Sequence, residues 1–320
     1  MVIDHSIHSF SLWHHFRHVP GFDALAFVDL AESLGFTGIN LSLNDENFRH
    51  MGGREEWRMD KLRQRLARSA MSLEIDTSDT RPEHLATLLR VAQRLGAGTL
   101  RTYTRHRGHA SVMMEMTAID LRQVAPIAAD CDVVVVLENH EDFTGPELAH
   151  IVEEVNHPNV KILYDYGNSQ MVMEDPEAAL DAVLPYVVSV HVKDHVMVRP
   201  EHAGQLTVAG VPMGEGFLPV RELTRRLLAY GIRRISFENV WAYTAAIQPG
   251  RSPLGKARLG EGAFRFVEPP FRPERLVLDQ RHFSPAELVQ LERLALGRGL
   301  EWFLGELRAL GVSGFKASGS

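Results

Sequence analysis

Short apolar runs alternate with longer amphipathic runs along most of the chain. The short runs are rich in β-branched residues, and eight of them predict strands: Ile7–Leu12, Gly38–Leu43, Met71–Asp76, Thr99–Thr104, Asp132–Glu138, Val160–Asp165, Val187–Lys193 and Arg233–Glu238. Between them, apolar residues recur at helical spacing, as in Phe22–Phe36. The other helical segments are Trp57–Ala70, Pro82–Ala97, Gly145–Val155, Asp175–Leu184 and Leu218–Gly231. This alternation indicates βα units and a parallel sheet.

Eight βα units favour one α/β architecture, a (β/α)8 TIM barrel. Such a barrel needs roughly 250 residues, so a chain of 320 residues fits one barrel with a C-terminal extension better than two equal domains. An open doubly wound sheet is the alternative. However, no glycine-rich phosphate loop follows any strand, and Gly214-Glu215-Gly216 lacks the fingerprint spacing. We therefore do not expect a dinucleotide site.

The strand and helix rhythm stops after the eighth predicted strand. We place the barrel domain at residues 1–244 and the extension at residues 245–320, beginning with a segment rich in Pro, Gly and Arg. Ser284 followed by Glu287 predicts a capping box at the start of a helix. We expect this helix to pack on the barrel, with a contact to a partner subunit as the alternative. The last four residues, ASGS, are expected to be disordered or to be a cloning remnant.

Composition and charge narrow the class of protein. Hydrophobic residues make up 45% and charged residues 23%, as in an ordinary globular chain. The net charge of −7 argues against binding to a nucleic acid backbone. We find no run long and apolar enough to span a membrane and no secretory signal, so no membrane association is expected. With Cys131 as the only cysteine, no internal disulfide forms, and we expect a cytoplasmic protein.

Four successive predicted strands end in side chains that can bind metals. Strand five ends at Glu138, strand six at Asp165 and strand eight at Glu238, while strand seven carries His191 near its end. In a closed barrel these ends meet at the catalytic face. Three carboxylates placed together repel one another unless a cation joins them. We therefore expect one divalent metal, Mn²⁺ or Mg²⁺, with Co²⁺ or Zn²⁺ as alternatives. The competing interpretation pairs each acid with a nearby Lys or Arg.

Strand alternation places two more residues above the expected metal. His140 shares the face of Glu138, and Lys193 shares the face of His191, each one step closer to the barrel mouth. His140 is a candidate general base and Lys193 a candidate for stabilising an oxyanion. Alternatively, His140 supports a carboxylate and Lys193 forms a salt bridge with Glu138 or Asp165. Asp194 points the other way, so we expect a structural role for it.

The first four predicted strands are less informative. Polar and aromatic residues lie at or after their ends: Trp13, His14, His15, Asn44, Asp45, Asp76, Arg101, Tyr103, Arg105, His106 and His109. They either form the wall of a pocket for a polar ring or belong to solvent-exposed loops. His106 and His109 are also candidates for binding additional metals, although a solvated loop explains them equally well.

Several blocks of the sequence resemble the xylose isomerase-like TIM-barrel superfamily, which includes sugar phosphate isomerase/epimerase-like proteins. The blocks are LENHEDFTGPELAHIVEEVNHPNVKILYDYGN, DPEAALDAVLPYVVSVHVKDH, GEGFLPVRELTRRLLAYGIRRISFE and, more weakly, FVDLAESLGFTGINL. The resemblance runs from about residue 7 to about residue 240. It implies a mononuclear site of Mn, Mg or Co, or of Zn in some branches, on Glu138, Asp165, His191 and Glu238. In the epimerase branch, the residues matching Glu138 and Glu238 also pass protons on opposite faces of a keto sugar.

The resemblance therefore implies a metal-dependent enzyme that abstracts a proton next to the carbonyl of a sugar or sugar derivative, in the manner of an isomerase or epimerase. The extension and the ENH block containing His140 differ from small epimerases, and that block recurs in dehydratases and in the metal-bearing subunit of C-glycoside deglycosidases. The alternative is consequently a carbon–carbon or carbon–oxygen lyase acting on a 3-keto sugar with a partner subunit.

Two further alternatives come from other classes of protein. One is an abasic-site endonuclease, which usually needs about two or three metals; the other is a non-catalytic barrel subunit. As partners we expect a small-molecule sugar or glycoside, and either a homo-oligomer or a complex with a smaller subunit.

Overall fold

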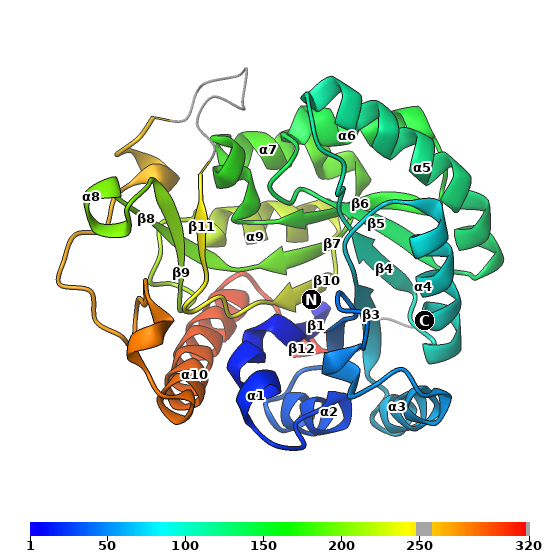
Figure 1. Cartoon of the computed structure of the whole chain (residues 1–320), viewed down its shortest axis with the longest axis horizontal. Helices are drawn as coiled ribbons and strands as arrows, with labels where there is room; N and C mark the ends of the chain where they lie inside the picture. The colour runs from blue at the N-terminus through cyan, green and yellow to red at the C-terminus, as the bar shows by residue number, and fades with distance from the viewer. Residues whose placement is uncertain (248–257, 318–320) are drawn as a thin grey trace.

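A computed structural model describes residues 1–247 and 258–317 of the chain (Figure 1). Eight parallel strands close into a barrel through the pairing of β10 with β1, in which Ile235 lies opposite His5. The barrel strands are β1 (Val2–His8), β2 (Gly38–Ser42), β3 (Ser72–Asp76), β4 (Thr99–Thr102), β5 (Val134–Glu138), β6 (Val160–Asp165), β7 (Val187–Val192) and β10 (Arg234–Phe237). The predicted (β/α)8 barrel is thus confirmed.

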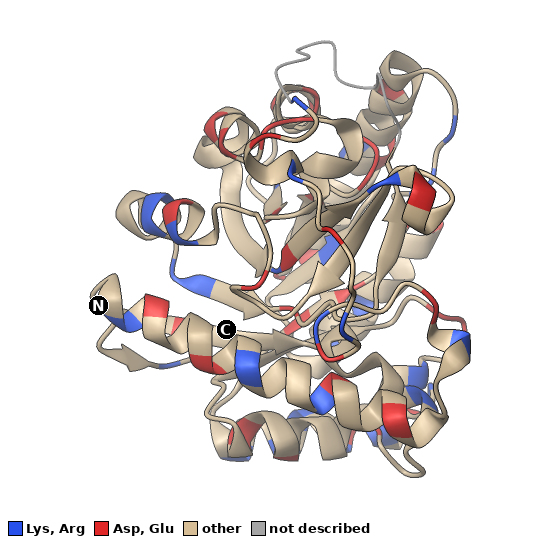
Figure 2. Cartoon of the chain, turned by 90° about the vertical axis from the view of Figure 1, so that its left-hand side faces the viewer, with Lys and Arg blue, Asp and Glu red and all other residues tan. Residues whose placement is uncertain are grey.

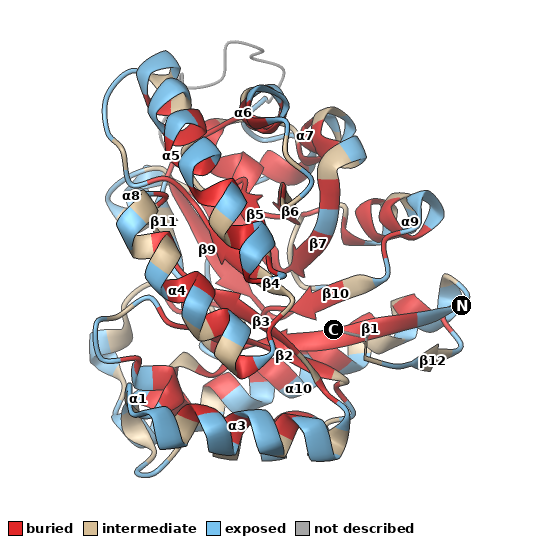
Figure 3. Ribbon diagram, turned by 90° about the vertical axis from the view of Figure 1, so that its right-hand side faces the viewer, coloured by how far each residue is buried: buried red, intermediate tan, exposed pale blue. Residues whose placement is uncertain are grey.

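Helices surround the barrel and expose their polar sides. They are α1 (Trp13–His18), α2 (Ala24–Ser33), α3 (Glu56–Ser69), α4 (Pro82–Leu95), α5 (Ala110–Asp130), α6 (Gly145–Val155), α7 (Pro176–Val183) and α9 (Val220–Tyr230). Figure 3 shows buried strands at the centre and helices exposed on one side. No helix within residues 1–247 and 258–317 is long and apolar enough to cross a membrane.

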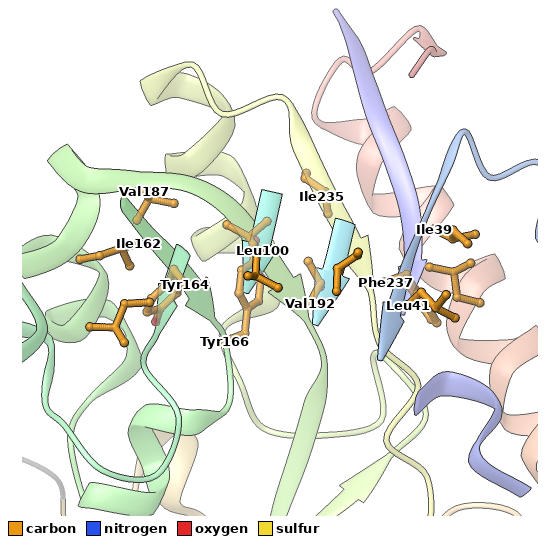
Figure 4. Close-up of a cluster of buried hydrophobic side chains, with 14 of the residues drawn as sticks. Ile39, Leu41, Leu100, Ile162, Tyr164, Tyr166, Val187, Val192, Ile235 and Phe237 are labelled. Carbon is orange, nitrogen blue, oxygen red and sulfur yellow. The ribbon is translucent and has the colours of Figure 1, made fainter. Parts of the chain in front are cut away.

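The two faces of the barrel strands carry different chemistry. Outward positions such as Ile39, Leu41 and Phe237 are buried apolar side chains (Figure 4). Inward positions are largely polar: Asn40 donates to Glu74, and Arg101 donates to Asp76. Because successive residues of a strand point to opposite faces, this division follows from the period of two.

The first predicted strand is displaced in the structure. We expected it at Ile7–Leu12, but β1 covers Val2–His8, and Ser9–Leu12 forms a 3-10 helix, η1. The inward residues of β1 are Asp4, Ser6 and His8, so its sequence lacks a continuous apolar run. The other seven predicted strands overlap the observed ones, with ends that differ by up to two residues.

A small sheet at the carboxyl end of the barrel is formed by the connection from β7 to α9 and by the segment that follows β10. Its strands are β8 (Asp194–Val198), β9 (Thr207–Val211) and β11 (Thr244–Ala246), with the short helix α8 (Pro200–Ala203) between β8 and β9. The sequence predicted no strand in either of these segments.

The extension returns to the barrel through α10 (Pro285–Ala309) and β12 (Gly314–Phe315), which pairs with β1. Ser284 and Glu287 form the predicted capping box. Helix α10 contacts α1, and its buried residues include Leu296, Leu300 and Phe303. On the side facing the viewer in Figure 2, charged residues of both signs are spread along this helix. Part of the Pro- and Gly-rich segment, and the final residues after 317, lie outside the described residues, so our expectations for them remain predictions.

Candidate metal centre and active-site pocket

Four side chains with metal-ligand chemistry lie at the carboxyl ends of adjacent barrel strands. Glu138 and Asp165 are the last residues of β5 and β6, His191 lies one residue before the end of β7, and Glu238 directly follows β10. Ligand atoms of Glu138, Asp165 and His191 all lie within 4.8 Å of one another. The carboxylate of Glu238 lies beside this group, 3.8 Å from Nζ of Lys193. Lys193 in turn lies 3.0 Å from Asp165.

Each of the three carboxylates has one buried oxygen that accepts no well-aligned hydrogen bond from the described residues. The atoms are Oε1 of Glu138, Oδ2 of Asp165 and Oε2 of Glu238. Their neighbours are Nδ1 of His191, 3.3 Å from Oε1 of Glu138, and Nζ of Lys193, 3.0 Å from Oδ2 of Asp165 and 3.8 Å from Oε2 of Glu238. Three buried carboxylates placed together repel one another, and a divalent cation shared among them relieves this repulsion. Carboxylate oxygens with one imidazole nitrogen suit Mn²⁺, Mg²⁺, Co²⁺ or Zn²⁺. The residues present therefore fit one divalent cation.

His191 is oriented by residues deeper in the barrel. Its Nε2 lies 2.8 Å from the side-chain amide nitrogen of Asn40 and 3.5 Å from Glu74, while Nδ1 faces Oε1 of Glu138 at 3.3 Å. Nδ1 is thus the nitrogen on the side of the candidate ligand Glu138. Burial alone would lower the pKa of His191, but hydrogen bonds to Glu138 and Glu74 raise it to about 10.

Two cationic side chains partly balance the carboxylates. Burial alone would raise the pKa of Glu138, but the Arg101 guanidinium holds it well below its usual range. Burial raises the pKa of Asp165 to about 6, even though Lys193 lies beside it. Lys193 also donates to Oδ1 of Asn168 at 2.8 Å. The structure thus shows the salt bridge from Lys193 to Asp165 that we considered as an alternative, with Nζ of Lys193 3.0 Å from Oδ2.

Asp76 connects the surroundings of the two glutamates. One oxygen accepts a hydrogen bond from Arg101 at 2.7 Å, and Arg101 also donates to Glu138. The other oxygen lies 2.7 Å from Nε2 of His8, whose Nδ1 lies 3.6 Å from Glu238. One buried carboxylate therefore positions both glutamates through a histidine and an arginine. Sequence reasoning noted Asp76 and Arg101 without a role, and it missed His8.

A cavity of about 450 Å³ opens above the candidate metal ligands. Its lining includes Glu138, His140, Lys193 and Glu238 together with the aromatic residues Phe10, Trp13, Tyr103, Trp241 and Tyr243. The imidazole of His140 stacks on the Tyr103 ring, with ring centroids 3.7 Å apart. Burial lowers the pKa of His140 to about 4. In residues 1–247 and 258–317 no hydrogen bond to its ring is found, so a neutral imidazole faces the cavity.

The other sequence candidates fall into two groups. Those that line the cavity are Trp13, His14, Asn44, Arg101, Tyr103 and Arg105, and Asn168 lines it beside them. The rest have local structural contacts: His15 with Glu292, His106 with Asp120, His109 with Ser111, and Asp45 with the backbone of Asn47 and Arg49. Asn139 binds both the backbone N–H and the carbonyl of Asp165.

Asp194 organises the loop after the small sheet. Its buried carboxylate accepts backbone hydrogen bonds from His195, Gly214, Gly216 and Leu218 at 2.9, 3.0, 2.9 and 3.2 Å. These contacts agree with the expected structural role.

We expect Asp194→Asn to lower the free energy of unfolding by about 2–4 kcal/mol. Either orientation of the amide leaves two buried N–H groups facing an NH₂ group, and such losses cost about 1–3 kcal/mol each. Urea unfolding followed by circular dichroism measures the change. Asp130→Asn, on an exposed position at the end of α5, is the matched control. A change below about 0.5 kcal/mol would show that these bonds do not hold the loop.

Comparisons with known proteins agree with this architecture. A family model described as a xylose isomerase-like TIM barrel matches residues 28–256. The chain is 24% identical over 204 residues to "Uncharacterized protein YihM" of Escherichia coli K12, covering 64% of this chain and 62% of that protein. It is 28% identical over 160 residues to 3-oxo-isoapionate decarboxylase of Pectobacterium atrosepticum, covering 50% and 58%. The chain therefore matches about three fifths of the length of these curated relatives.

Solved structures show the same fold. The D-psicose 3-epimerase of Clostridium cellulolyticum H10, solved with D-tagatose, superposes with a TM-score of 0.64 at 14% identity, covering 95% of this chain and 99% of that one. At this identity the likeness concerns the fold alone.

Proposed function

Because the chain belongs to the xylose isomerase-like TIM-barrel family, we propose that it is a divalent-metal-dependent enzyme acting on a keto sugar or a sugar derivative. It removes a proton from the carbon next to the carbonyl and returns it, as an isomerase or epimerase does. The relative solved with D-tagatose is a sugar epimerase by its name.

The grouping of ligand-type residues at the strand ends is the main support for this proposal. Four ligand-type residues lie at four adjacent strand ends: ligand atoms of Glu138, Asp165 and His191 lie within 4.8 Å of one another, and Glu238 follows the next strand. Pairing with Lys or Arg, the competing interpretation, accounts for only part of this acidic group, because one ammonium group, that of Lys193, serves both Oδ2 of Asp165 at 3.0 Å and Oε2 of Glu238 at 3.8 Å. Glu138, Asp165, His191 and Glu238 would hold the metal, which when bound stabilises negative charge on the substrate oxygens.

The side chains of this chain supply the remaining chemistry. Glu138 and Glu238 both line the cavity and lie on non-adjacent strands, so they can carry a proton to and from a substrate placed between them. Lys193 lies near both Asp165 and Glu238 and faces the cavity, where its charge favours a developing oxyanion. The aromatic residues on the cavity wall exclude water from the reacting carbon.

Proton abstraction can be tested without knowing the natural substrate. Chelator-stripped protein is incubated in D₂O with Mn²⁺ and with D-tagatose or D-psicose, and proton NMR follows the signals of the carbons next to the carbonyl. We expect metal-dependent loss of one of these signals, together with a second ketose. Equal exchange with and without the metal, or a conversion without exchange, would rule out the proposed chemistry.

A second candidate function is a lyase on a 3-keto sugar, and His140 is the observation that favours it. Its neutral imidazole faces the cavity without a hydrogen-bonded partner in the described part of the chain, so it can act as a base separate from the metal ligands. The relative from Pectobacterium atrosepticum is a decarboxylase of a 3-oxo sugar acid by its name. Release of CO₂ from 3-oxo-isoapionate by the reconstituted protein would select this candidate.

The proposal extends to the ion, the cellular location and the assembly of the protein. We propose Mn²⁺ or Mg²⁺ as the ion, since carboxylates dominate the ligand set. We also propose a cytoplasmic location, because the single cysteine, Cys131, is buried and reduced. Assembly as a homo-oligomer or with a smaller subunit remains a proposal that light scattering tests.

A further inference from the structure

A buried glutamate of the C-terminal helix reaches the first helix of the barrel. Glu292 lies on α10 and is 2% exposed. Its carboxylate accepts hydrogen bonds from the backbone N–H groups of His14 and His15, at 2.8 and 3.1 Å. The same carboxylate lies 2.6 Å from Nδ1 of His15. Within the described residues, every hydrogen bond of this carboxylate is therefore directed at the start of α1.

Helix α1 has no capping side chain of its own. Leu12 occupies the position before its first residue and makes no side-chain hydrogen bond to the helix. The first N–H groups of a helix lack partners within it and are normally satisfied by a nearby Ser, Thr, Asp or Asn. Glu292 takes this role from a distance of more than 270 residues along the chain, so the geometry of α1 depends on α10.

The start of α1 forms one side of the cavity. Trp13 and His14 both line it, and the ring of His14 packs edge-on against Trp241 with centroids 6.0 Å apart. We call Trp13, His14 and Trp241 the α1 wall. The wall thus offers aromatic surface to the cavity.

Residues of the C-terminal extension also contact Trp241, the other part of this wall. Trp241 packs in a cluster with Leu288 and Ala295 of α10 and donates its indole N–H to the carbonyl of Pro273 at 2.8 Å. Asn239, next to Glu238, donates to the carbonyls of both Ser11 and Glu292. Helix α10 therefore contacts the α1 wall on two sides and reaches the residue that follows a candidate metal ligand.

We propose that Glu292 is a positioning residue of the active site, which fixes the α1 wall so that it binds the part of the substrate remote from the metal. This proposal rests on the sugar-binding function proposed for the cavity. Aromatic rings pack against the C–H faces of a sugar, and the α1 wall presents such rings to the cavity. Loss of Glu292 should thus weaken substrate binding while the metal and the proton carriers remain in place.

The test compares Glu292→Gln and Glu292→Ala with Glu301→Gln, an exposed glutamate of the same helix. The first measurement, hydrogen exchange of the Mn²⁺-loaded proteins without sugar, needs no substrate. We expect amides in residues 13–18 to exchange at least about 10-fold faster in both Glu292 variants, while residues 160–165 and the Glu301 control stay unchanged. Unchanged exchange in residues 13–18 would overturn the proposal.

The second measurement uses D-psicose as the probe. We expect KM to rise about 10- to 100-fold in the Glu292 variants, with kcat within about threefold of wild type and the bound Mn²⁺ per chain unaltered. If Glu292→Ala does not fold, the KM of Glu292→Gln, which keeps one acceptor oxygen, tests the proposal. A fall in kcat at constant KM, or a loss of Mn²⁺, contradicts a positioning role. If wild type turns over neither D-psicose nor D-tagatose, the proposed function fails, and the exchange rates alone decide whether Glu292 positions α1.

Discussion

Asp165→Asn is expected to remove the metal and to lower kcat/KM by at least about 1,000-fold, the scale of effect seen when groups that stabilise transition-state charge are lost. Oδ1 of Asp165 accepts the N–H groups of Gly167 and Asn168, at 2.8 and 3.0 Å, and the Asn oxygen retains these bonds. Oδ2, which lies 3.0 Å from Nζ of Lys193, becomes an NH₂ group directed at the metal position. The substitution therefore alters metal ligation and the ion pair with Lys193, while the backbone contacts of the loop are retained.

The measurement combines metal analysis with the rate of proton exchange in D₂O. Asp181→Asn, an exposed position on α7, serves as the control and should retain both properties. Circular dichroism establishes that Asp165→Asn is folded. A folded variant that keeps wild-type activity would refute the assignment of Asp165.

The second large effect concerns the proton carrier. We expect Glu238→Gln to reduce kcat by about 100- to 10,000-fold, which is the usual contribution of a general base. His140→Gln should reduce it by less than about 10-fold if the reaction is an epimerisation, because His140 then only lines the cavity. If kcat instead falls more in His140→Gln than in Glu238→Gln, His140 is identified as the base, and the lyase is favoured.

The double variant Glu238→Gln/His140→Gln separates the two roles further. If Glu238 carries the proton, adding the His140 substitution changes the rate little beyond Glu238→Gln alone. Rates are measured at saturating Mn²⁺, with the bound metal quantified in each sample, because Glu238 is also a candidate ligand. Full turnover by the double variant with metal bound would exclude both residues as proton carriers.

The sequence predicted the barrel because outward-facing positions of the strands are apolar. Both ends of strand β6, Val160–Asp165, were predicted correctly, since Ile162 and Tyr164 face the helices and Asp165 ends the apolar run. Strand β1 was misplaced because its inward residues are Asp4, Ser6 and His8, which interrupt the apolar pattern. The small sheet was missed because β8 and β9 lie inside one connection of the barrel and β11 follows the last barrel strand, outside the regular alternation of strands and helices.

The four candidate ligands were found because each stands at a strand end, where the barrel architecture assigns catalytic groups. Arg101 contacts Asp76 from the neighbouring strand β4, where the two residues are paired, and His8 reaches Asp76 from β1, two strands away. These contacts depend on the register between strands, which the spacing of residues in one chain does not encode. Glu292 was missed for the same reason. Its helical position is typical of an exposed residue, and only the docking of α10 buries it against α1.

The number of metal ions bound per chain tests the central claim most directly. Protein is stripped with a chelator, reconstituted with Mn²⁺, freed of unbound ion and analysed for manganese, alongside the variant Asp165→Asn/Glu238→Gln. We predict about one Mn²⁺ per chain in the wild type and less than about one tenth of that in the folded double variant. Equal manganese in both proteins, or none in the wild type with any divalent ion, would contradict a metal centre formed by Glu138, Asp165, His191 and Glu238.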